Sequence, residues 1–211
     1  MFRNQNRRLN HKASTTVISA VILATGPEQS AAEPKVFLPL KGKPVLQWVL
    51  GNALAANLDE IICVTRELRS VRKQIHLVDE RLFWIADDDA DRGTNASVIS
   101  GLWATNPQSD GALFLDGDQP LVRTELINAL LARFRNSGAW IVAPSFRGKA
   151  RNPLLFHREL FPELLRLSGK RTPRSLLRKH RRKTVLVECL DEIPFLDLDV
   201  RADFERIEEL A

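Results

Sequence analysis

Two kinds of hydrophobic pattern alternate along the chain. Short, almost continuous apolar runs rich in β-branched residues are typical of strands buried on both faces, and apolar positions every three or four residues are typical of amphipathic helices. This alternation predicts an α/β fold, with a Rossmann-like, mostly parallel (mixed) sheet and helices on both faces. We expect strands at residues 15–25, 61–65, 82–86, 111–115, 139–143, 152–156, 185–190 and 195–198.

The helical segments have recognisable starts. Pro44 suits a first helical turn, Asn95 is expected to cap a helix, and Thr124 begins a strongly periodic segment. No internal repeat or long linker interrupts the pattern, so residues 16–211 are expected to form one domain. We expect helices at residues 44–57, 67–76, 96–105, 124–134, 158–167, 172–180 and after 201.

Composition narrows the class of protein. The 211 residues are 44% hydrophobic, and an apolar run such as Val17–Ala24 is far shorter than the roughly 20 residues of a membrane helix. With no signal peptide evident, we expect a cytoplasmic protein. Residues 1–15 carry four cations and no acid, which predicts a flexible basic arm. The rest of the chain has 27 of the 31 cations and all 26 acids, so the predicted domain is close to neutral.

The cysteines and histidines do not indicate a zinc site or a disulfide framework. Cys63 and Cys189 each lie in an apolar, strand-like run, where a free cysteine is expected to be a small buried side chain. None of the four histidines has a Cys or His partner at helical spacing.

Two carboxylates follow a predicted strand. Asp116 and Asp118 come directly after the run GALFL, with Gly117 between them and Pro120 beyond. Ligands of open α/β sheets bind beyond the carboxyl ends of the strands, and paired carboxylates there suit Mg²⁺. The alternative is that these residues are ordinary turn formers.

A second acidic pair lies near the C-terminus. Asp197 and Asp199 flank Leu198, so a strand there would point both carboxylates to one face, which strengthens the metal interpretation. The acidic segment Asp87–Asp91 is interpreted instead as a solvated turn.

The segment Lys170–Lys183 contains eight cations and no acid. It is either a solvated helix face or an anion site for a phosphorylated or pterin substrate, because arginine clusters bind phosphates. Nucleic-acid binding is not indicated, since no groove-reading element or aromatic interleaving accompanies the charge.

Several motifs together resemble one family. The string VILATGPEQSAAEPKVFLPLKGKPVLQWVL resembles the opening of MobA-like nucleotidyltransferases that attach a nucleotide to molybdopterin. The strings GTNASVISGLWA, FLDGDQPLV, FRGKARNPLLFHRELFPELLRLSG and LDLDVRADFERI follow in the order of the molybdenum-cofactor cytidylyltransferase branch. The resemblance extends from about Thr16 to Leu210.

The resemblance implies a nucleotide-diphospho-sugar transferase fold and a reaction. A nucleoside triphosphate, CTP or GTP, would bind with Mg²⁺ and donate its nucleotidyl group to a molybdopterin-type acceptor, releasing pyrophosphate. A molybdoenzyme or its chaperone would be a further partner. The implied residues are Leu23, Ala24, Thr25, Gly26, Lys35, Gly93 and Ser97 for the nucleotide, Lys35 and Asp118 for catalysis, Asp118 and Asp199 for the metal, and Asn152, Pro153 and Arg174 for the acceptor.

The phosphate-binding loop departs from the family pattern. Thr25 replaces an Ala, Ser30 replaces an Arg and Ala32 replaces a Gly, while Glu28 occupies a small-residue position. The loop therefore has lost a cation and gained an anion, although Arg151 and Lys170 add positive charge elsewhere.

Three functions remain open after this change. The chain is an active transferase, a catalytically impaired module that binds a nucleotide or cofactor for delivery, or a transferase for another acceptor such as a phosphosugar or phospholactate.

Overall fold

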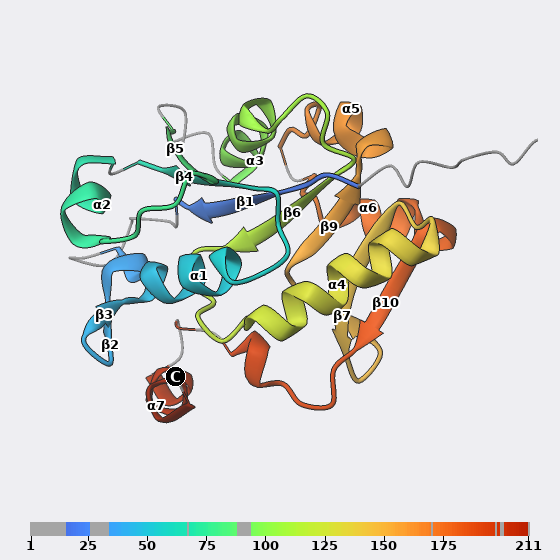
Figure 1. The fold of residues 1–211 in the computed structure, drawn as a ribbon. Coiled ribbons are helices and arrows are strands. Elements are labelled where there is room, and N and C mark those ends of the chain that lie inside the picture. The colour runs from blue at the N-terminus through green and yellow to red at the C-terminus, as the bar shows by residue number, and fades with distance from the viewer. Residues whose placement is uncertain are drawn as a thin grey trace, which may run out of the picture.

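The computed structural model describes residues 16–25, 34–66, 68–87, 94–169, 171–196, 198 and 201–210, without the side chains of residues 94 and 201–204. In these residues one sheet has the strand order β10-β7-β9-β6-β1-β4-β5, and β8 pairs with β7 (Figure 1). A separate hairpin pairs β2 with β3. The strands are β1 (Ile18–Ala24), β2 (Pro39–Leu40), β3 (Lys43–Pro44), β4 (Glu60–Thr65), β5 (Leu82–Ala86), β6 (Gly111–Asp116), β7 (Ile141–Phe146), β8 (Lys149–Ala150), β9 (Leu154–His157) and β10 (Thr184–Glu188).

The sheet is mixed, as the alternating pattern predicts. β1 runs parallel to β4 and β6, β4 to β5, and β7 to β10. β9 is the exception in the centre of the sheet, because it pairs antiparallel with both β6 and β7.

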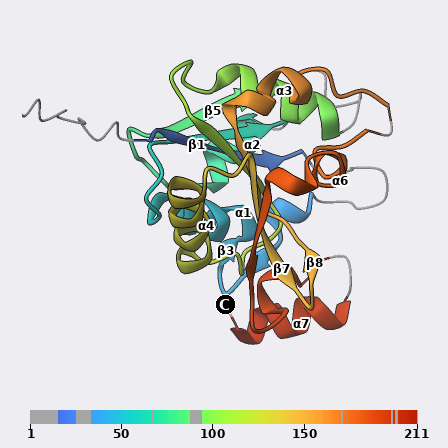
Figure 2. The ribbon, with the colours of Figure 1, turned by 90° about the vertical axis from the view of Figure 1, so that its right-hand side faces the viewer.

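Helices cover both faces of this sheet (Figure 2). α1 (Val45–Leu54), α2 (Leu68–Gln74) and α4 (Thr124–Ser137) pack on one face, around a buried cluster that includes Ile22 and Leu130. α3 (Thr94–Ala104), α5 (Phe161–Leu164) and α6 (Ser175–Lys179) pack on the other, around a cluster that includes Val21 and Leu160. The prediction of an α/β fold with helices on both faces is confirmed.

Some predicted elements need correction. The strand expected at 195–198 is wrong: residues Ile193–Phe195 form a 3-10 helix, since Pro194 lacks the N–H that a strand ladder needs. Asn95 lies inside α3 rather than capping it, and Pro44 is the N-cap residue of α1. The helix expected at 158–167 is a short 3-10 turn followed by α5, and the two-residue strands β2, β3 and β8 were not predicted.

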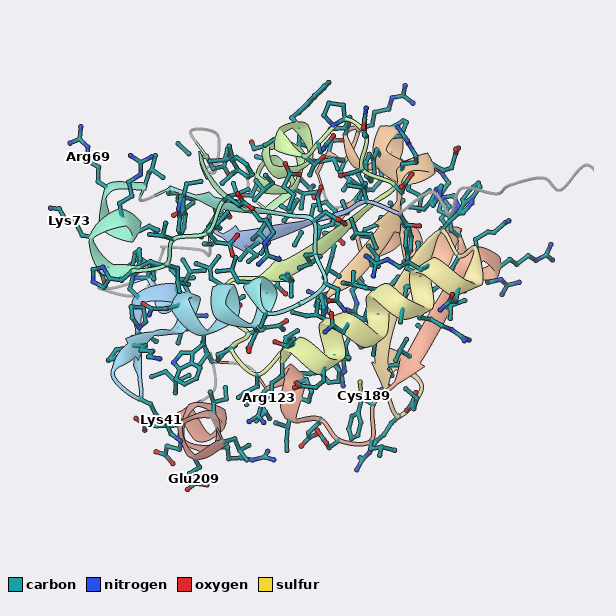
Figure 3. The ribbon with its side chains drawn as sticks, in the orientation of Figure 1. Lys41, Arg69, Lys73, Arg123, Cys189 and Glu209 are labelled. Atoms are coloured by element: carbon teal, nitrogen blue, oxygen red, sulfur yellow. The ribbon has the colours of Figure 1, made fainter. Side chains whose placement is uncertain are left out.

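The cysteine prediction is half right. Cys63 is fully buried in β4, whereas Cys189 lies just beyond β10 and is only partly buried (Figure 3). Burial raises the pKa of both thiols, and the carboxylates of Asp191 and Glu188 raise that of Cys189 further. None of the described helices has the length and apolar character needed to cross a membrane.

The last helix, α7 (Arg201–Leu210), packs against the hairpin of β2 and β3. Ile207 is completely buried in a third apolar cluster with Leu40 of β2 and Leu121. Arg123, labelled beside α7 in Figure 3, donates a 2.6 Å hydrogen bond from its guanidinium to the carbonyl oxygen of Leu210. α7 therefore supports the hairpin that directly follows the segment beginning at Lys35.

Carboxylates satisfy the amino end of β1. The N–H of Val17 donates to Asp110 at 3.0 Å, and the N–H of Ile18 donates to Asp59 at 2.8 Å. The opposite, carboxyl edge of the sheet carries the residues that the sequence singles out.

α3 packs against β1 and β4 at Gly101. A Cβ there would overlap Val21 Cγ1 and lie 3.0 Å from Val64 Cγ2, both closer than van der Waals contact. A larger residue requires α3 or these two valine side chains to shift. Because α3 also carries Ser97, this close packing sets how far Ser97 lies from the ends of β1 and β4.

We predict that Gly101→Ala lowers the free energy of unfolding by about 1 to 3 kcal/mol, because overpacking strains the α3 contact. Gly51→Ala is the matched control: Gly51 is also inside a helix, but a Cβ there would meet nothing within 4 Å. It should stabilise the protein by about 0.5 to 1 kcal/mol through helix propensity. Urea unfolding of both variants measures the difference, and equal shifts would contradict the packing argument.

Candidate functional site

The candidate residues gather at the carboxyl edge of the sheet. β1, β4, β5, β6 and β7 all end there, and the antiparallel β9 begins there. This edge is where open α/β sheets bind ligands. Two groups of residues lie here. The nucleotide side, named for the role that the resemblance implies for Thr25 and Ser97, is at the ends of β1 and β5, and the acceptor side, named for that implied for Asn152, is at the start of β9. The β6 end, by which we mean Asp116–Asp118, lies between them.

The turn after β6 lies against the end of β1. The N–H of Gly117 donates to the carbonyl oxygen of Leu23 at 2.9 Å, and a Cβ at Gly117 would lie 2.9 Å from that same oxygen. Only glycine fits such a close approach between backbones. It places Asp116 and Asp118 beside the predicted nucleotide residues Leu23, Ala24 and Thr25.

The nucleotide side contains a chain of polar side chains. The hydroxyl oxygens of Thr25 and Ser97 lie 2.7 Å apart, which joins the end of β1 to α3. Ser97 Oγ donates to Asp87 Oδ2 at 2.5 Å, and the N–H of Asp87 donates to the Thr65 carbonyl at 2.9 Å. Two residues implied by the resemblance, Thr25 and Ser97, are therefore in direct contact.

Asp87 corrects one interpretation of the sequence. It is 4% exposed, not solvated as the acidic turn predicts, and its other oxygen accepts a 3.4 Å hydrogen bond from Ser100. Its position immediately after β5 could have identified Asp87 as a candidate site residue, because the same rule about strand ends selects Asp116. The other three aspartates of that segment, at 88, 89 and 91, lie outside the described residues.

The acceptor side meets the β6 end through Asn152. Its side-chain amide donates to Asp116 Oδ2 at 2.6 Å. The Asn152–Pro153 peptide bond is cis, and both residues precede β9 rather than lying within it as predicted. Arg174, just before α6, donates to the carbonyl oxygen of Ala150, so the three implied acceptor residues lie close together.

Part of the basic segment has a structural role. Glu163 on α5 accepts hydrogen bonds from Lys179 Nζ at 2.6 Å and from His180 Nε2 at 3.0 Å. Burial alone would raise the pKa of Glu163, but these two partners outweigh it and the pKa is lowered. The contacts hold the end of α6 to α5, and with it the segment that begins at Arg174.

Asn95 joins the two sides at the start of α3. Its side-chain amide donates to the carbonyl oxygens of Gly169 and Arg171, at 3.2 and 2.9 Å. The helix that carries Ser97 is thus tied to the loop that leads into α6. Arg151, which adds charge relative to the family pattern, has a buried Nε–H that donates to no acceptor among the described residues.

Lys35 begins a 3-10 helix, Lys35–Phe37, and is partly buried. Val36 and Phe37 are buried in the core, so the helix is fixed to the domain just ahead of the hairpin that α7 supports. The remaining predicted residues lie outside the described ranges, as does the predicted basic arm of residues 1–15: they are Gly26, Gly93, Asp197, Asp199, the loop residues Glu28, Ser30 and Ala32, and Lys170.

The β6 end could hold a divalent cation. Asp116 and Asp118 offer carboxylate oxygens, and Mg²⁺ is commonly held by one or two carboxylates together with substrate phosphates. In the part of the chain that the structure describes, no group of three His, Cys, Asp or Glu side chains is placed to hold a metal. The donors present fit an ion shared with a phosphate, not an all-protein cage.

Comparison with known proteins identifies the family. Residues 20–184 match the family model described as MobA-like NTP transferase domain. Among curated proteins, a 3-deoxy-manno-octulosonate cytidylyltransferase from Synechococcus elongatus is 32% identical over 54% of this chain and 47% of its own. The bifunctional protein GlmU from Geobacter sulfurreducens is 28% identical over 58% of this chain and 26% of its own. The match thus spans less than half the length of either relative.

A solved structure covers nearly the whole chain. Rv0371c from Mycobacterium tuberculosis H37Rv superposes with a TM-score of 0.77 at 25% identity, over 92% of this chain and 98% of that one. A structure of that protein in complex with manganese gives a TM-score of 0.72 at 26% identity, over 93% and 100%. The family model covers well over half of the sequence, and the chain therefore belongs to the MobA-like NTP transferase family.

Proposed function

We propose that this protein is a nucleotidyltransferase that moves the nucleotidyl group of CTP or GTP onto a phosphorylated acceptor. One observation carries the proposal: the β6 end lies between the polar nucleotide side and the acceptor side, and Asn152 contacts Asp116 directly. An acceptor oxygen would bond to the α-phosphorus while the bond to the pyrophosphate oxygen breaks. The family, and the cytidylyltransferase named among the relatives, support this reaction class.

In this proposal, the charge and position of each residue suggest its role. Lys35 would neutralise the triphosphate, with Leu23, Ala24, Thr25, Gly26, Gly93 and Ser97 lining the nucleotide site. Asp118, with Asp199 as a second ligand, would hold Mg²⁺, which would neutralise the charge growing on the leaving pyrophosphate. A hard divalent cation is consistent with the manganese complex of the M. tuberculosis protein.

A molybdopterin-type compound is the acceptor we propose to test first. The segment from Phe146 to Gly169 carries the resemblance to the cofactor branch, and it supplies Asn152 and Pro153 at the site. Arg174 adds a cation beside Ala150 that suits an acceptor phosphate. A molybdoenzyme or its chaperone would then receive the product.

We predict that Asp118→Ala lowers Mg²⁺-dependent pyrophosphate release by about 1000-fold, because a positioned electrostatic group of this kind contributes on the order of 100 to 1000-fold or more. Pyrophosphate released from CTP or GTP with molybdopterin is the measurement. Asp191→Asn is the control, since Asp191 is exposed and its capping of the Ile193 N–H survives in an amide. An unaltered rate in Asp118→Ala would refute the metal assignment.

Asn152→Asp should raise the KM for the acceptor more than Asn152→Ala does. The aspartate would face Asp116, and two carboxylates about 4 Å apart repel by roughly 4 kcal/mol at an effective dielectric of 20. We expect the KM for the acceptor to rise by about 10-fold or more in Asn152→Asp, with the Kd for the nucleotide within about twofold of wild type. Asn136→Asp, on the exposed side of α4, should change neither constant. A nucleotide Kd that shifts as much as the acceptor KM would contradict the acceptor-side assignment.

The changed phosphate loop favours a second candidate function. A module that holds a nucleotide or finished cofactor for delivery needs no efficient triphosphate cradle, and the loop has lost an Arg and gained Glu28. This function predicts calorimetric binding of a molybdopterin dinucleotide and no heat with any nucleoside triphosphate. Binding of CTP or GTP with Mg²⁺, followed by pyrophosphate release, would reject it.

A further inference from the structure

Three side chains on the nucleotide side form a hydroxyl relay, by which we mean Thr25, Ser97 and Asp87. Thr25 Oγ1 lies 2.7 Å from Ser97 Oγ, and Ser97 Oγ lies 2.5 Å from Asp87 Oδ2. The three residues come from the end of β1, from α3 and from the end of β5. The relay therefore spans the edge of the sheet beside the β6 turn.

Asp87, at the buried end of the relay, determines which group donates in each of its hydrogen bonds. An ionised carboxylate only accepts hydrogen bonds, and each hydroxyl has a single proton to donate. Ser97 uses its proton on Asp87, so it can only accept from Thr25. Thr25 in turn uses its proton on Ser97, which leaves Thr25 Oγ1 with lone pairs alone.

The surroundings hold this direction in place. Ser97 is 1% exposed and Asp87 is 4% exposed, so water does not compete for their bond. Asp87 is fixed further by Ser100 and by its own N–H, which donates to Thr65. Thr25 is partly exposed, and its hydroxyl makes no other hydrogen bond among the described residues. The relay therefore ends in an acceptor at the surface of the nucleotide side.

We propose that Thr25 is a specificity-determining residue that accepts a hydrogen bond from a donor group of the bound nucleoside, with Ser97 and Asp87 as positioning residues. The donor would be an amino group of the base or a hydroxyl of the ribose. A carbonyl or phosphate oxygen at the same place would meet lone pairs and be disfavoured. The inference rests on the proposed function, and it concerns a position where the family pattern has Ala and this chain has Thr.

The test compares nucleotides that differ by one donor. CTP and UTP differ by an amino group against a carbonyl, GTP and ITP differ by one amino group, and the 2′-deoxy and 3′-deoxy triphosphates lack one ribose hydroxyl. We expect wild type, with Mg²⁺, to bind the donor-bearing member of one such pair about 10-fold more tightly by calorimetry. The pair that responds identifies the base or the ribose as the source.

Thr25→Val removes the acceptor while keeping the shape, so the ratio of Kd values in the responding pair should fall to within about twofold of unity. In the CTP and UTP pair, Ser97→Ala should have the same effect, because it frees the Thr25 proton to serve the UTP carbonyl. In the other pairs Thr25 still accepts from the donor, and the ratio should persist. Thr25→Ser keeps the hydroxyl and should preserve the ratio. Thermal unfolding of each variant separates a change of selectivity from a loss of fold.

Thr105→Val is the matched control for the loss of a buried hydroxyl. Thr105 follows the last residue of α3, at the opposite end of the helix from Ser97, and its hydroxyl donates to the carbonyl oxygen of Leu102 at 2.8 Å. The variant should preserve the ratio of Kd values even where it lowers the unfolding temperature.

The outcomes distinguish the two proposals. If wild type binds triphosphates but gives the same ratio of Kd values as Thr25→Val in every pair, the relay is overturned and the proposed function stands. Wild type that binds no triphosphate would overturn both. Selectivity that disappears in Thr25→Val but survives in Thr25→Ser would establish Thr25 as the acceptor even if turnover is slow. Loss of CTP over UTP selectivity in Ser97→Ala as well would establish the relay.

Discussion

The contact between the β6 turn and the end of β1 determines the rest of the site. β1 lies between two parallel neighbours, and the Gly117 N–H donates to the Leu23 carbonyl. A Cβ at Gly117 would lie only 2.9 Å from that same oxygen, which excludes a side chain there. Backbone geometry at this turn therefore places Asp116 and Asp118. The nucleotide side and the acceptor side become neighbours because each adjoins the same turn.

The antiparallel strand β9 gives the site its second half. A wholly parallel sheet would bring another strand's carboxyl end next to β6, followed by a loop into a helix. Because β9 runs the other way, its first residues reach the edge, and the Asn152 amide can meet Asp116. The helix pair α5 and α6, held by Glu163, then closes this side and brings in Arg174.

Much of this could be predicted from the sequence because apolar runs and strand ends are local features. The rule that ligands bind beyond strand ends draws attention to Asp116 and to the segment after Ile18–Ala24, and the structure places both at the carboxyl edge of the sheet. Asp87 escapes it, since four aspartates within five residues resemble a solvated turn. Burial of Asp87 depends on hydroxyls of α3 that lie 10 and 13 positions further on. The strand predicted at 195–198 rests only on the apolar residues there. Pro194 favours a 3-10 helix at Ile193–Phe195 instead.

The two halves of the site differ in how a substitution affects them. The β6 turn depends on backbone contact at Gly117, so a side chain there would alter the position of every group beside it. The nucleotide side depends on side-chain hydrogen bonds, so exchanging Ala for Thr at position 25 adds a group without moving a strand: β1 keeps its register with β4 up to Ala24. On the proposal made above, an exchange at position 25 would alter selectivity for a nucleoside while the fold and the carboxylates of the β6 end stay as they are. A hydroxyl on its own can either donate or accept a hydrogen bond, so a Thr at position 25 would not by itself select a donor. The buried carboxylate of Asp87 takes the proton of Ser97, and Ser97 then takes the proton of Thr25. This order leaves Thr25 Oγ1 as an acceptor only.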